Sequence, residues 1–86
     1  MDSLSANGPV QRYLETYGLR QYQLADEAGL HYVTISRIVR GDLHIPEKLK
    51  NYWRSKGITE GAILDWESEQ ARLIAKRKER DERRAA

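Results

Sequence analysis

The feature that most constrains the fold of this chain is segment 21–41, QYQLADEAGLHYVTISRIVRG. Apolar residues recur at helical spacing in its first half: Leu24, Ala25 and Ala28. Residues 21–28 are therefore predicted to form a short helix with one apolar face. Gly29 follows the last apolar position, where helices commonly end in a residue with positive φ. The segment thus predicts a helix followed by a sharp turn.

A second helix is predicted over residues 32–40, and its two sides differ in chemistry. At about 100° per residue, one side gathers the aliphatic residues Ile35, Ile38 and Val39. The other side carries Val33, Ser36, Arg37 and Arg40. Ala25 is small, so the two helices can cross closely and leave the polar side of the second one outward. Gly41 is predicted to end this helix, and Pro46 to begin the next.

Several residue types stand together in this segment at fixed positions: Gln21, Leu24-Ala25, Gly29-Leu30, Thr34-Ile35-Ser36-Arg37 and Gly41. In this set the segment resembles the helix-turn-helix of Cro/repressor-type (XRE-like) transcriptional regulators of phages and bacteria. The resemblance covers roughly residues 10–57 and fixes small, apolar, polar and glycine positions over about 20 residues, which a two-residue motif would not do. It implies that the chain binds DNA rather than forming a merely structural helical hairpin.

The chain departs from the family pattern at two positions that precede helices. Arg20 and His31 stand where the family often has serine or threonine. Neither helix is therefore expected to have a strong N-cap. Both residues instead bring polar groups to helix N-termini that would face phosphate.

The resemblance implies an all-α fold, a compact lambda-repressor-like bundle of four to five helices that contains the helix-turn-helix and has an extended C-terminal helix. We expect a flexible N-terminal arm at residues 1–8 and a DNA-binding domain at 9–58. Within that domain, helical spacing also predicts a first helix from Pro9 to Gly18 and another that ends near Gly57. Residues 59–86 are expected to form the C-terminal helix with a charged tail.

The C-terminal helix carries a stripe at alternating three- and four-residue steps: Ile63, Trp66, Gln70 and Leu73. Thr59 is its expected N-cap. The stripe is too short for a stable isolated coiled coil, so we expect it to lie partly on the domain and to pair with a second copy. These four residues are the predicted dimerisation element, with Trp66 as its anchor.

The formal net charge is only +2, but the charges are segregated along the chain. Residues 37–56 hold six basic and two acidic side chains, whereas residues 60–69 hold four acidic side chains and no basic one. Residues 76–84 hold six basic and three acidic side chains. We expect this last block to be solvated rather than to contact DNA.

Composition argues against several classes of function. With 86 residues and no cysteine, the chain is expected to form one small domain without disulfides or thiolate chemistry. His31 and His44 lack clustered partners, and no catalytic set can be assembled, so we expect no metal, no cofactor and no enzymatic activity. Without an apolar membrane span or signal peptide, the expected location is the cytoplasm.

The second helix of the motif is expected to read base edges in the major groove. The predicted DNA-binding residues are Gln21, Tyr32, Val33, Thr34, Ser36, Arg37, Arg40 and His44. Arg37 is expected to pair with guanine, with a phosphate or an intramolecular carboxylate as the alternative partner. Val33 is expected to contact a thymine methyl group, with partial burial as the alternative.

The resulting hypothesis is a sequence-specific regulator, a repressor that binds a palindromic operator on double-stranded DNA as a homodimer. The alternative is an antitoxin or anti-regulator module whose C-terminal helix binds a partner protein, which the acidic block and Trp66 would suit. An RNA-binding helical domain is a third interpretation, because basic blocks attract any polyanion.

Overall fold

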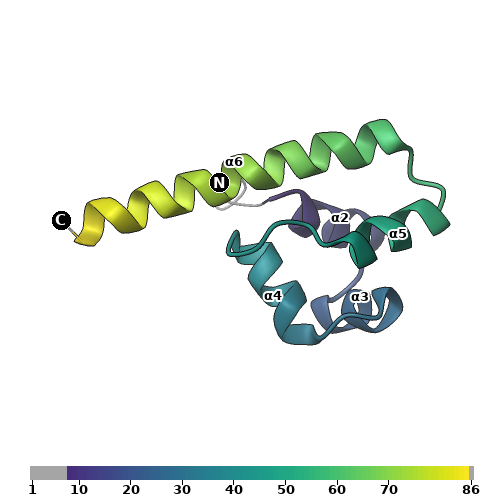
Figure 1. The fold of residues 1–86 in the computed structure, drawn as a ribbon. Helices are drawn as coiled ribbons and strands as arrows, with labels where there is room; N and C mark the ends of the chain where they lie inside the picture. Colours follow the sequence, from purple (N-terminus) through teal and green to yellow (C-terminus); the bar gives the residue numbers. More distant parts are fainter. Residues whose placement is uncertain (1–7, 86) are drawn as a thin grey trace.

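The computed structural model describes residues 8–85, and the side chains of residues 8–82. Five helices follow one another: α2 (Pro9–Tyr17), α3 (Gln21–Ala28), α4 (Tyr32–Arg40), α5 (Glu47–Ser55) and α6 (Glu60–Ala85). Helices α2 to α5 gather on one side of α6, which runs along them and extends past the end of α4 (Figure 1). The predicted all-α class with a long last helix is confirmed.

The helix ends agree with those predicted from the sequence. Gly29 and Gly41 follow α3 and α4 with φ values of 73° and 86°, a region that side chains with a Cβ rarely adopt. The residue after each glycine donates its N–H back into the helix, Leu30 to the Ala25 carbonyl at 2.8 Å and Asp42 to the Arg37 carbonyl at 2.9 Å. At the start of α6, Thr59 Oγ1 accepts the Ala62 N–H at 3.2 Å, so the predicted N-cap is confirmed.

One apolar core receives side chains from every helix. Its buried members are Val10, Tyr13, Leu14, Leu24, Ala25, Ile35, Ile38, Ile45, Leu49, Tyr52, Trp53 and Ile63. Trp53 is fully buried, and its ring centroid lies 5.7 Å from that of Tyr13 and 4.7 Å from that of Trp66. Since α4 enters this core only through its inner side, its outer side stays exposed.

A short chain of hydroxyl groups links three helices beside the core. Tyr52 donates to Glu27 Oε1 at 2.6 Å, and the Tyr13 hydroxyl donates to the Tyr52 hydroxyl at 3.4 Å. Burial raises the pKa of both tyrosines, and at Tyr52 the hydrogen bond to Glu27 raises the pKa further. Both hydroxyls therefore stay protonated, and they hold α3 against α5 and α2.

The acidic block on α6 is paired within the chain. Glu60 lies 2.6 Å from Arg54, Glu67 lies 2.7 Å from Lys50, and Glu69 lies 2.6 Å from Arg12. The pairs of Arg54 and Arg12 are exposed, so each contributes at most about 1 kcal/mol to stability, whereas the Lys50–Glu67 pair is partly buried. Together these pairs align α6 with α5 and α2. Segment 60–69 has four acidic residues and no basic one, and three of the four pair with a basic residue on another helix.

The stripe assigned to dimerisation faces the domain, which corrects part of that assignment. Ile63 and Gln70 are each 1 % exposed, and Trp66 and Leu73 are partly buried against the domain. Burying the stripe against the same chain avoids the entropy cost of bringing two chains together. The side chains of Ile63 and Gln70 are consequently not available to a second copy.

The N-terminal arm expected at residues 1–8 lies outside the described residues except for Gly8, which is buried rather than flexible. A Cβ at Gly8 would lie 2.6 Å from Leu73 Cδ2, so this glycine packs directly against α6. Among residues 8–85, no helix is long and apolar enough to cross a membrane.

Candidate nucleic-acid interface

The outward side of α4 is the most accessible surface among the predicted site residues. Tyr32 is 51 % exposed and Val33 44 %, and Arg37 and Arg40 are also exposed. These four residues lie opposite Ile35 and Ile38, which are fully buried. The partial burial considered for Val33 is therefore limited to about half of its surface, and its methyl groups reach solvent.

The other predicted site residues are distributed around this surface. Thr34 and Ser36 are partly buried on α4, and Gln21 is partly buried as the first residue of α3. His44 is exposed in the loop between α4 and α5, past the C-terminal end of α4. The structure thus gathers Tyr32, Val33, Arg37 and Arg40 on one side of a helix and leaves His44 apart from them in the chain.

The two arginines of this surface differ in their partners. Among the described residues, none forms an ion pair or a hydrogen bond with the side chain of Arg37. The guanidinium of Arg40 lies 3.6 Å from Asp42 Oδ2. No described residue therefore supplies the intramolecular carboxylate considered for Arg37, whose exposed side chain carries five N–H donors.

Basic residues on α5 are engaged elsewhere. Lys50 and Arg54 pair with acidic residues of α5 and α6, and Lys48 donates to the Gly29 carbonyl at 3.3 Å. Lys48 thereby supports the C-terminal end of α3, where a cation is favourable. In the basic segment 37–56, Arg37, Lys48 and Lys56 have no ion pair with a described residue, and Arg37 is the one of these three that lies on α4.

Both helices of the segment have N-terminal supports that the sequence analysis did not anticipate. His31 Nδ1 accepts the Val33 N–H at 3.1 Å and so caps α4. Gln23 Oε1 accepts the Arg20 N–H at 2.8 Å, the return half of a capping box on α3. The expectation of a weak N-cap was wrong for α4, because an imidazole nitrogen can accept the N–H that serine or threonine usually accepts. It holds for α3, where the Arg20 side chain accepts no backbone N–H.

The His31 cap can be tested by stability. His31→Ala is expected to lower the free energy of unfolding by about 1 kcal/mol, because one N–H at the start of α4 loses its acceptor. His31→Asn should retain most of the stability, since asparagine also caps helices. Urea denaturation followed by circular dichroism measures both, and equal stability of the alanine variant and the wild type would contradict the cap.

One exposed aromatic residue in the first turn of α3 was not among the predicted site residues. Tyr22 is 59 % exposed and follows Gln21 in the first turn of α3. Its position opposite Leu24 on the helix was visible in the sequence, but only the fold shows that nothing covers it. A tyrosine hydroxyl here can donate to a phosphate oxygen.

The groups gathered on α4 are exposed side chains that can make contacts with a binding partner. In residues 8–85, no three histidine or carboxylate side chains come together in a way that could hold a metal ion. What α4 offers is a rigid helical surface with one unpaired guanidinium, one half-exposed aliphatic side chain and hydroxyl groups. Comparison of the chain with protein families, curated proteins and solved structures gives no match.

Proposed function

We propose that this chain is a sequence-specific, double-stranded DNA-binding transcriptional regulator in which α3 and α4 act as a helix-turn-helix of the Cro/repressor type. The observation that carries the proposal is the outward side of α4, where Arg37 has no partner among the described residues while the basic side chains of α5 do. Its support is the short connection from Gly29 to His31, which joins α3 to a helix anchored by Ile35 and Ile38.

The dimensions of α4 suit the major groove of DNA. A helix of nine residues is about 14 Å long, and the groove, about 12 Å wide, admits one helix. In this position Arg37 would donate two hydrogen bonds to guanine O6 and N7, and Val33 would contact a thymine methyl group. Arg40, Tyr32 and the N-terminus of α3 would meet phosphates and fix the register of the helix on the duplex.

Repression would follow from occupation of the operator, which would prevent other proteins from binding there. A palindromic operator would require two copies of the chain related by a two-fold axis. Because Ile63 and Gln70 are buried within one chain, we propose that the homodimer uses another surface. Three of the four acids of the acidic block, and Trp66, have contacts within the chain, so we favour the DNA-binding regulator over the antitoxin or anti-regulator module.

The proposal is tested by binding to a duplex selected from a random pool and to a scrambled duplex of the same composition. We expect affinity for both to fall as salt rises, because binding to phosphates releases counterions. The preference for the selected duplex should persist over the same salt range, since base contacts release no ions. Fluorescence anisotropy measures both affinities, and equal affinity at every salt concentration would refute sequence-specific reading. A competing RNA duplex serves as the control for general polyanion binding.

A further inference from the structure

Helix α6 donates hydrogen bonds to backbone carbonyl groups at the end of α4 and in the loop that follows it. The last four carbonyl groups of an α-helix accept no i→i+4 hydrogen bond from an N–H of the same helix. Gln70, buried in α6, donates through Nε2 to the Ile38 carbonyl at 2.7 Å and to the Leu43 carbonyl at 2.8 Å. Arg77 Nη1 donates to the Arg40 carbonyl at 3.2 Å. Two side chains of α6 therefore hold the last turn of α4 and the loop after it.

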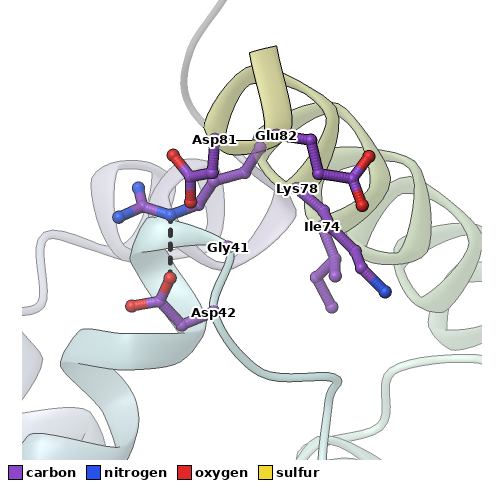
Figure 2. Close-up of a pocket in the computed structure, with 7 residues that line it drawn as sticks. Gly41, Asp42, Ile74, Lys78, Asp81 and Glu82 are labelled. Carbon is purple, nitrogen blue, oxygen red and sulfur yellow. Dashed lines mark ion pairs between the residues drawn. The ribbon is translucent and has the colours of Figure 1, made fainter. Parts of the chain in front are cut away.

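Apolar contact reinforces this junction at one point. A Cβ at Gly41 would lie 2.9 Å from Leu73 Cγ, so Leu73 packs on the backbone where α4 ends. Farther along α6, Ile74 and Lys78 line an open cavity of about 400 Å³ together with Gly41 and Asp42 (Figure 2). Beyond Leu73 the helices are consequently joined by polar contacts rather than by apolar packing.

Those polar contacts meet at the carboxylate of Asp42. Arg77 Nε lies 2.8 Å from Asp42 Oδ1, the ion pair marked by the dashed line in Figure 2. The other oxygen, Oδ2, lies 3.6 Å from Arg40 Nε on the outward side of α4. Arg77 thus competes with Arg40 for one carboxylate. If Arg77 is removed, Asp42 can turn wholly towards Arg40 and neutralise it.

We propose that Gln70 and Arg77 are positioning residues for the DNA-reading side of α4, an inference that rests on the proposed function. Gln70 fixes the last turn of α4, and Arg77 keeps Asp42 from neutralising Arg40. Direct readout requires side chains to be held within about 0.5 Å of the productive geometry, which α4 cannot ensure if its last turn frays. The long C-terminal helix α6 thus positions the outward side of α4, although no residue of α6 belongs to that side.

The first readout is amide hydrogen exchange of the protein without DNA. Gln70→Met fills a similar volume but cannot donate, and Arg77→Ala removes a side chain that is 44 % exposed and should leave the fold intact. Both are expected to accelerate exchange of the Gly41 and Asp42 amides about tenfold or more. Arg72→Ala is the matched control, since Arg72 is an exposed arginine on α6 without an ion pair or hydrogen bond to the described residues. Unchanged exchange in Gln70→Met and Arg77→Ala would overturn the proposal.

The second readout is the ratio of affinities for the selected and scrambled duplexes. It is measured at a temperature at which each variant is folded. We expect Gln70→Met to reduce this ratio at least about fivefold, whereas Arg72→Ala should keep it. Arg77→Ala lets Asp42 neutralise Arg40, the proposed phosphate contact, so it should lower the affinity for both duplexes more than Arg72→Ala does. Ile63→Val controls for stability, because it loosens α6 far from α4 and should lower the melting temperature without changing the ratio. Faster exchange with an unchanged ratio in Gln70→Met, or unchanged affinity of Arg77→Ala for both duplexes, would overturn the positioning role. Absence of any preference in the wild type would instead refute the proposed function, and the exchange data distinguish the two failures.

Discussion

Arg37→Ala is expected to lower the affinity for the selected duplex by about 10- to 100-fold while changing the affinity for a scrambled duplex far less. The reason is that a bidentate arginine–guanine pair contributes about 1–3 kcal/mol of discrimination. The side chain has no intramolecular ion pair or hydrogen bond with the described residues, so its removal breaks no such contact in the free protein. Fluorescence anisotropy with both duplexes measures the effect. The circular dichroism spectrum should be the same as that of the wild type, because the fold is unchanged.

Two further variants distinguish base reading by Arg37 from a phosphate contact. Arg37→Lys keeps the positive charge but lacks the planar pair of donors, so it should lose most of the discrimination and keep the general affinity. Arg72→Ala removes the same charge from α6 and should leave the ratio of affinities for the selected and scrambled duplexes unchanged. Arg37 would instead be a phosphate contact if Arg37→Ala lowered the affinity for both duplexes equally. The slope of log affinity against log salt concentration would then decrease in magnitude by about 1.

Trp53→Ala is expected to cost about 3–5 kcal/mol of unfolding free energy, the largest effect on stability among our predictions. Trp53 is fully buried between Tyr13 and Trp66, and its removal leaves a cavity where α2, α5 and α6 meet. Small domains have only about 5–15 kcal/mol of stability in total. The variant should therefore unfold at a much lower urea concentration or lose its cooperative transition.

Leu64→Ala provides the matched control for Trp53→Ala. Leu64 lies on α6 and is 59 % exposed, so its truncation should change stability by less than about 0.5 kcal/mol. Urea denaturation followed by far-ultraviolet circular dichroism measures both variants. A Trp53→Ala transition within about 1 kcal/mol of the wild type would show that the junction of these three helices does not depend on this ring.

Much of the fold could be predicted because its signals are local. The bounds of α3 and α4, the glycines that end them and the inward direction of Ile35 and Ile38 all follow from residues within one or two helical turns. The outward position of Val33 and Arg37 follows from the same periodicity. The cap at His31 was missed because residue preferences record frequent solutions, whereas an uncommon side chain with suitable geometry can make the same hydrogen bond.

By itself, the sequence determined which segments of this protein are helical, where they end and which side of each is apolar, because these properties depend on short-range periodicity and backbone preferences. Only the tertiary structure decided what the stripe of α6 packs against. An apolar stripe specifies burial but not the partner, and here the partner is the same chain, with Gln70 bound to carbonyl groups 27 and 32 residues away. The same holds for the acidic block of α6, whose basic partners stand on α2 and α5. Long-range pairs depend on how the helices are arranged in space, and no local pattern in the sequence encodes that arrangement.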